Sequence, residues 1–269
     1  MADYHIGFAL SGGFIRGLAH LGMMQALFEN NIRPGILSGT SAGSIAAAFI
    51  ADGKEPYQVM ELFASQTFTG LAKIHPNREG LITMDKFGDF LQTNLSARRI
   101  EDLKIPTVIT ATDFDGGQSV HFRSGDLVKC LTASCCIPVL FTPVSIGKKM
   151  YVDGGVFMNL PVSPIRQECD TVIALNVVKL ASKEYHHNIG GIAMRAFGLM
   201  FAANSLPELK QADVVISPDG LEKFANYELD KTEEIFSIGY FAALRVLEEM
   251  DEASINQLKL NDPRHGRKE

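Results

Sequence analysis

The sequence lacks a basic stretch, a CxxC pair and a long apolar run, and each absence excludes a class of protein. The chain of 269 residues has a formal net charge of −6, whereas a nucleic-acid-binding surface requires a concentration of lysine and arginine. We therefore expect no nucleic-acid partner. The four cysteines have neither the spacing of a zinc site nor that of a secreted disulfide framework. Reduced thiols in a cytoplasmic protein are the expectation.

Motifs for metals and organic cofactors are also missing. There is no HExxH-type spacing, and the glycines of residues 12–17 follow neither GxGxxG nor GK[ST]. No acidic residue ends the second predicted strand, where a dinucleotide-binding fold would carry one. We expect no metal and no cofactor.

Export and membrane-spanning segments are not evident either. The first residues have no basic region and no long apolar region, so we expect no signal peptide. The most apolar later stretch, residues 192–203, is interrupted by Arg195 and is shorter than the about 20 residues that cross a bilayer. We expect no transmembrane segment.

Short apolar runs alternate with segments of helical periodicity along the chain, which has an ordinary globular composition. Strands are predicted at residues 5–10, 36–38, 106–112, 119–123, 171–178 and 213–217, a hairpin at 144–152, and helices at 18–30, 44–51, 56–68, 126–136, 189–209 and 231–250. We expect a helical insertion at residues 71–99, with its helix at 85–95. This alternation predicts one α/β domain with a mainly parallel sheet covered by helices on both faces.

Residues 39–43, GTSAG, match the GxSxG pattern of a nucleophile elbow. In such an elbow a strained strand-to-helix turn presents the serine, here Ser41, and a Cβ at Gly39 or Gly43 would collide with neighbouring elements. A glycine-bounded helix start is the alternative. The position between a predicted strand and a predicted helix favours the catalytic interpretation.

Residues 11–17, SGGFIRG, follow the first predicted strand. Adjacent glycines there allow backbone N–H groups to converge on an oxyanion, which is often the largest contribution to acyl transfer. A plain turn is the alternative for this loop.

Residues 153–155, DGG, end the predicted hairpin. Such a sequence is most often only a turn. If Asp153 is a base, Gly154 and Gly155 would let its backbone approach Ser41 closely. A carboxylate serves that role only where burial raises its pKa toward neutrality.

The histidines separate two kinds of serine hydrolase. An α/β-hydrolase places its histidine after the serine and the acid, so His186, His187 or His265 would have to act as the base. Ser41 follows only the second predicted strand, which is early for that fold. We expect the other histidines to be structural or exposed.

Four segments, SGGFIRG, GTSAG, ASCCIPVLFTPV and DGGVFMNLPV, occur in this order and resemble the patatin-like phospholipases, particularly their bacterial members. The resemblance covers residues 5–217, with residues 218–260 expected as a helical extension packed on the same domain and residues 261–269 as a flexible tail. It implies a three-layer α/β/α fold and a serine-aspartate dyad without histidine.

By this resemblance Ser41 is the nucleophile, Asp153 the base, and Gly12, Gly13 and Phe14 the oxyanion hole, with Arg16 as a structural anchor of the loop. The implied substrate is a lipid acyl ester, a phospholipid or lysophospholipid, and contact with a membrane surface is left open, as is the oligomeric state.

The chain departs from the family at Phe14, where the usual run GGGxRG has its third glycine. Left-handed geometry would cost a phenylalanine about 1–2 kcal/mol, so a regular backbone there, with the ring at the pocket mouth, is the alternative. A catalytically weak lipid-binding or scaffold protein is the corresponding alternative function.

Overall fold

A computed structural model describes residues 2–66, 73–74, 80–180, 185, 187–224 and 229–259. Its centre is an eight-stranded sheet in which the consecutive members of the series β11-β10-β1-β2-β5-β9-β8 are hydrogen-bonded to each other, and β6 is also paired to β5. The strands are β1 (Tyr4–Leu10), β2 (Ile36–Thr40), β5 (Thr107–Asp113), β6 (Gln118–Phe122), β8 (Val144–Ile146), β9 (Lys149–Asp153), β10 (Cys169–Leu175) and β11 (Val214–Ile216). The five from β11 to β5 are parallel, so the sheet is mainly parallel as predicted.

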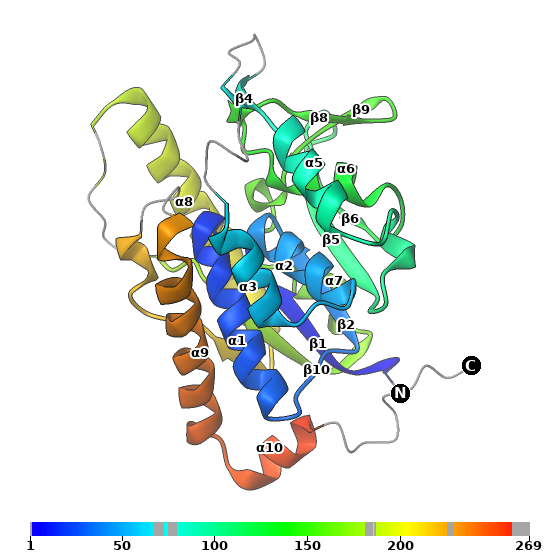
Figure 1. Cartoon of the computed structure of the whole chain (residues 1–269), viewed down its shortest axis with the longest axis vertical. Coiled ribbons are helices and arrows are strands. Elements are labelled where there is room, and N and C mark those ends of the chain that lie inside the picture. Colours follow the sequence, from blue (N-terminus) through cyan, green and yellow to red (C-terminus); the bar gives the residue numbers. More distant parts are fainter. Residues whose placement is uncertain are drawn as a thin grey trace.

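Helices cover both faces of this sheet (Figure 1). They are α1 (Leu18–Glu29), α2 (Ala42–Ala51), α3 (Pro56–Ala64), α5 (Asp85–Asn94), α6 (Leu127–Cys135), α7 (Ser163–Arg166), α8 (Ile189–Leu209), α9 (Thr232–Glu249) and α10 (Glu252–Leu258). Strand β1 shows why two layers are needed: Phe8 and Leu10 enter one core cluster, whereas Ala9 enters another. Alternate residues of a strand face opposite sides of a sheet, so each face needs its own apolar cover.

Helix α9, in the C-terminal part of the chain, packs directly on α1. A Cβ built on Gly22 of α1 would lie 1.9 Å from Phe236 O, and one built on Gly239 of α9 would lie 2.1 Å from Ala19 O. The two helices therefore touch backbone to backbone, which places residues 232–249 in the same core as the sheet. The predicted tail at residues 261–269 lies outside the described residues.

A second, three-stranded sheet consists of β3 (Lys73–Ile74), β4 (Gly80–Thr83) and β7 (Val139–Phe141). The prediction of a helical insertion at residues 71–99 is confirmed for α5 and wrong for β3 and β4. Strand β4 pairs in parallel with β7, more than fifty residues later in the chain. Local periodicity does not reveal such a distant partner.

Helix α8 is longer than the apolar stretch that we judged too short to cross a bilayer. Among the described helices it is the one that is long and apolar enough, by length and composition only, to do so. Its C-terminal half is nevertheless part of the fold, because Phe201, Ser205 and Glu208 are buried.

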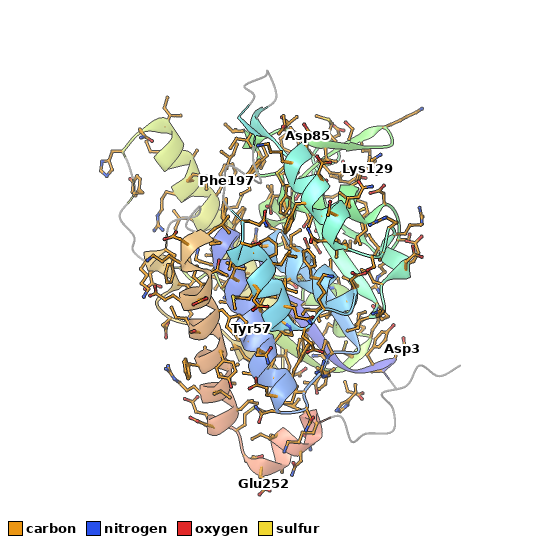
Figure 2. All side chains as sticks on the ribbon, in the orientation of Figure 1. Asp3, Tyr57, Asp85, Lys129, Phe197 and Glu252 are labelled. Carbon is orange, nitrogen blue, oxygen red and sulfur yellow. The ribbon has the colours of Figure 1, made fainter. Side chains whose placement is uncertain are left out.

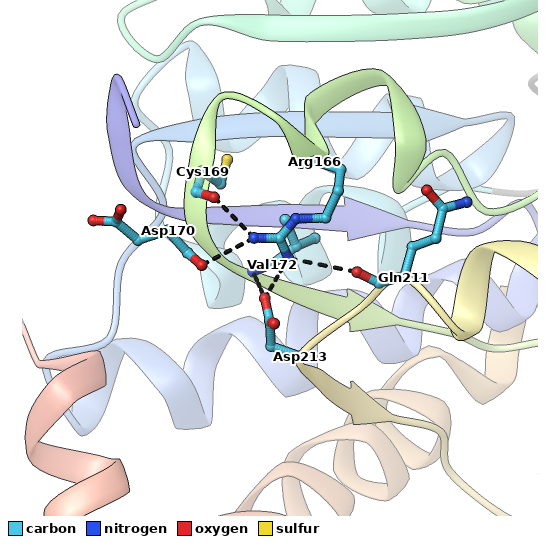
Figure 3. A network of polar contacts seen from close by, with 6 residues as sticks. All are labelled: Arg166, Cys169, Asp170, Val172, Gln211 and Asp213. Atoms are coloured by element: carbon cyan, nitrogen blue, oxygen red, sulfur yellow. Dashed lines mark hydrogen bonds and ion pairs between the residues drawn. The ribbon is translucent and has the colours of Figure 1, made fainter. Parts of the chain in front are cut away.

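A polar network closes the end of the sheet where β10 begins (Figure 3). The Arg166 guanidinium donates to Cys169 O at 2.8 Å and to Asp170 O at 2.9 Å, and forms an ion pair with Asp213. The Asp213 carboxylate also accepts the Val172 N–H at 2.7 Å. These bonds fasten α7 and the start of β11 to β10, at the end of the parallel strands opposite to Ser41.

Candidate active site

A change of partner along one edge of β5 brings Ser41 and Asp153 together. Thr40, the last residue of β2, pairs with Thr110, and Asp153, the last residue of β9, pairs with the next residue, Ala111. Strand β6 occupies the opposite edge over residues 109–113. Strands β2 and β9 therefore lie end to end on the same edge of β5, and Ser41, which follows Thr40, meets Asp153 at the junction.

Ser41 lies on a strained turn between β2 and α2, with φ of 52°. This is the left-handed region that a residue with a Cβ rarely adopts. A Cβ on Gly39 would lie 2.6 Å from the Gly43 carbonyl, and one on Gly43 would lie 2.3 Å from Leu10 O. The predicted collisions at both glycines are confirmed, and the local geometry is that of a nucleophile elbow.

Ser134, a residue to which we assigned no role from the sequence, holds this turn in place. Its hydroxyl accepts the Ser41 N–H at 2.8 Å and donates to Thr110 O at 2.7 Å, and its side chain is fully buried. It thus satisfies two backbone groups at the point where β2 ends. Its position in the segment ASCCIP could have placed Ser134 near the site. The sequence does not indicate that its hydroxyl would bind the backbone at Ser41.

Asp153 is a buried carboxyl group with one oxygen left available. Oδ1 accepts the Gly155 N–H at 2.8 Å, whereas Oδ2 is buried and accepts no hydrogen bond from the described residues. Burial raises the carboxyl pKa to about 7, against smaller lowering contributions from the Ser41 hydroxyl and the Gly155 N–H. This is the shift that a carboxylate base for serine requires.

The glycines after Asp153 permit its close approach. A Cβ on Gly154 would lie 2.4 Å from Thr110 O, and one on Gly155 would lie 2.8 Å from the Phe201 ring. Neither position has room for a side chain, so the sequence DGG is required by packing at this junction.

The glycine loop lies against Ser41, but only part of the loop has N–H groups that are free to donate. A Cβ on Gly12 would be 3.2 Å from the Ser41 Cβ. The Gly12 N–H donates to Asn159 O at 2.9 Å, so we correct its predicted role: Gly12 allows the close approach and does not supply a donor. The N–H groups of Gly13 and Phe14 have no acceptor among the described residues, which leaves them available to an oxyanion.

Phe14 adopts the strained alternative. Its φ is 54°, so the regular backbone that we considered at this position is wrong, and the side chain does line the pocket beside Ser41. Such strain persists where the surrounding structure fixes it, as at many functional sites. Arg16, predicted as an anchor of this loop, is half-buried; burial lowers its pKa while attraction to Glu222 opposes that change.

A pocket of about 190 Å³ opens beside Ser41. Side chains of α1, α2, α3 and α5 form much of its wall, and every lining side chain is apolar except Ser41 and Cys135. Phe141, in the segment ASCCIPVLFTPV, is also part of this wall. The contributions of α1 and α3 were not predicted, because their apolar residues have the periodicity of ordinary core helices.

Other reactive groups near the site are unsuited to nucleophilic or basic roles. The Cys135 thiol has its pKa raised well above the ordinary value by burial and by Asp153, so it stays protonated and inert. His187 is exposed and stacks on Tyr185, while His186 and His265 lie outside the described residues. Across the part of the chain that the structure describes, no histidine is hydrogen-bonded to Ser41 or Asp153, and no cluster could hold a metal ion.

The sheet order, the elbow and the glycine loop define an α/β protein with a site centred on a serine. The family model described as patatin-like phospholipase matches residues 8–165, and the chain belongs to this family. Its fold is similar to that of VipD from Legionella pneumophila, with a TM-score of 0.54 and 15% identity over 92% of this chain and 67% of that one.

Curated relatives include an uncharacterised NTE family protein of Mycobacterium tuberculosis, 30% identical over 64% of this chain and 49% of that protein. Lysophospholipase NTE1 of Saccharomyces cerevisiae is 28% identical over 87% of this chain and 16% of its own length. The chain thus spans about half the length of the mycobacterial relative and a much smaller part of the yeast relative.

Proposed function

We propose that this chain is a serine acyl hydrolase that cleaves lipid acyl esters through Ser41 and Asp153. The observation that carries the proposal is the buried carboxyl of Asp153, with a pKa of about 7, at the junction where β9 meets the nucleophile turn after β2. Near neutral pH a substantial fraction of such a group is ionised and can accept a proton, which an ordinary aspartate does too weakly to activate serine.

In the acylation half-reaction, Asp153 Oδ2 takes the proton of the Ser41 hydroxyl as Oγ attacks the ester carbonyl carbon. The negative charge that develops on the carbonyl oxygen is stabilised by the N–H groups of Gly13 and Phe14. As the intermediate collapses, the bond to the alcohol oxygen breaks and Asp153 returns the proton to that oxygen. The alcohol leaves, and an acyl ester of Ser41 remains.

In the deacylation half-reaction, Asp153 takes a proton from water, and the hydroxide attacks the acyl carbon. The same two N–H groups stabilise the second oxyanion. The bond to Ser41 Oγ then breaks, Oγ recovers the proton from Asp153, and the carboxylic acid is released. Each cycle consumes one water and returns Ser41 and Asp153 to their starting protonation states.

The pocket has an apolar wall without charged side chains. Such a wall suits the acyl chain of a lipid, because burial of an apolar chain is favourable and needs no polar partner. The head group would then remain outside the pocket. The name of the yeast relative, a lysophospholipase, supports a phospholipid or lysophospholipid as the substrate class.

The test is the initial rate of hydrolysis of a short chromogenic ester by four proteins: wild type, Ser41→Ala, Asp153→Asn, and the His186→Ala/His187→Ala double variant. The first two substitutions are expected to lower kcat by ~10²- to 10⁴-fold, as loss of a nucleophile or base does. The histidine variant should retain the wild-type rate. Loss of activity in the histidine variant would instead support a histidine-dependent esterase, and an inactive wild type would support a lipid-binding protein.

A further inference from the structure

Helix α8 exposes a continuous apolar stripe. Six exposed residues recur along it at alternating spacings of three and four, which places them on one face. This outer stripe consists of Ile189, Ile192, Ala196, Leu199, Ala203 and Leu206. The exposed fraction reaches 90% at Ile189 and 55% at Ile192, and α8 extends past the neighbouring elements in Figures 1 and 2, where Phe197 marks it.

The inward side of α8 is linked by hydrogen bonds to both loops of the candidate site. The Asn204 side chain donates to Gly155 O at 2.6 Å and accepts the Asn159 N–H at 2.8 Å. Asn159 O in turn accepts the Gly12 N–H at 2.9 Å. One helix therefore carries an exposed apolar face outside, and inside it contacts the aspartate loop directly and the glycine loop through Asn159.

The composition around the outer stripe favours a lipid surface over another protein. A coiled coil with a second copy would place charged residues beside the stripe, and an ordinary protein interface would have a polar rim. The flanking positions here are Ala193, Arg195, Met200, Ala202, Pro207 and Leu209. Only Arg195 is charged, and residues 189–207 contain no acidic side chain in a chain of net charge −6, so nothing there repels an anionic membrane.

We propose that the outer stripe docks the protein on a lipid bilayer, with α8 lying along the interface. The helix is long and apolar enough to suit hydrocarbon, but its buried residues Phe201, Ser205 and Glu208 keep it attached to the fold, so it lies on the membrane and does not cross it. That the docked surface supplies the substrate of the Ser41 pocket rests on the proposed function; the docking itself does not.

The test is co-sedimentation of the full chain with vesicles of phosphatidylcholine, alone or mixed with phosphatidylglycerol. The variant is Ile192→Glu/Leu199→Glu, and the matched control is Phe241→Glu, which alters an equally apolar and 61% exposed side chain on α9. Wild type and control should bind both vesicles, because apolar burial dominates, and the double variant should bind at least about tenfold more weakly. Ile189→Glu is the milder variant if the double variant misfolds.

Hydrolysis of a water-soluble short ester, measured on the same samples, reports folding and the proposed function separately, and should be equal in wild type, double variant and control. Failure of the wild type to bind, or undiminished binding by the double variant, would overturn the docking proposal. So would a wild-type dimer that the double variant converts to monomer with vesicle binding unchanged, because the stripe would then bind a second copy. An inactive wild type that still binds vesicles through the stripe would overturn the proposed function and support the docking.

Discussion

Burial of Asp153 raises its pKa to about 7 from an ordinary value of 3.8, and this shift affects folding as well as the proposed catalysis. Between these two values the folded protein holds a proton that the unfolded chain releases. The free energy of unfolding therefore falls as pH rises from about 4 to about 7, by up to ~4 kcal/mol from this group. The ionised Asp153 that the proposed mechanism requires is thus present only where the fold is less stable.

We predict that Asp153→Asn, which cannot ionise, stabilises the protein above neutral pH by a few kcal/mol. The gain should shrink as pH falls toward 5, where Asp153 is protonated in the wild type. Urea unfolding of both proteins at about pH 5 and about pH 8 measures the difference. A variant no more stable than wild type at the higher pH would show that Asp153 pays no burial penalty.

We infer that Ser134 positions the proposed nucleophile, so its removal should affect turnover more than substrate binding. Ser134→Ala leaves the Ser41 N–H and Thr110 O without their partner, so we expect a stability loss of about 2–4 kcal/mol. Because the nucleophile turn loses its anchor, kcat should fall about 10- to 100-fold with little change in KM.

The matched control for Ser134 is Ser38→Ala. Ser38 is also fully buried and donates to Pro161 O at 2.7 Å, but it lies inside β2, away from the turn. The Ser38→Ala variant should be less stable than wild type and have the same kcat. An equal loss of kcat in both variants would mean that Ser134 acts only through general stability.

At the scale of elements, β7 contains a strained residue whose side chain is not stabilised by burial. Val139 has φ of 71° and is 67% exposed, an unfavourable combination for a β-branched side chain. We predict that Val139→Gly raises the free energy of unfolding by about 1 kcal/mol, because relief of left-handed strain outweighs the entropy cost of glycine. Thermal or urea unfolding measures the change.

The control for this prediction is Val215→Gly in β11, at a 37% exposed valine that is not among the residues of positive φ. That substitution should destabilise by about 1 kcal/mol. Destabilisation by Val139→Gly to the same extent would contradict the assignment of strain to Val139.

The elements that sequence patterns predicted well are those whose partners are regular and close. Strands β1, β2 and β5 and helices α1 and α9 begin and end within a few residues of prediction, because apolar periodicity follows burial in a layered sheet. The three-stranded sheet was missed because β4 pairs with β7, a distant segment. The break in pairing along β5, which brings Ser41 and Asp153 together, follows from register and was not visible in the motifs.

At the scale of the whole molecule, the motifs named residues that the fold brings together, but they did not reveal the surfaces around those residues. Ser41, Asp153 and the glycine loop meet at the ends of strands, where ligands of parallel sheets bind. The pocket wall is formed by helices from separate segments of the chain. The outer stripe of α8 has the same apolar composition as the face of a buried helix. Only the packed fold shows which apolar faces are covered.

The most direct test of the Ser41-Asp153 account is the rate at which a fluorophosphonate labels the protein, measured from about pH 5 to about pH 9, with the labelled residue located by mass spectrometry. We predict a label on Ser41, at a rate that rises through one ionisation near pH 7 and then levels, because Asp153 must be ionised to accept the serine proton. Asp153→Asn should label slowly and without this pH dependence. A label on another residue, or an Asp153→Asn protein that labels as fast as wild type, would contradict it.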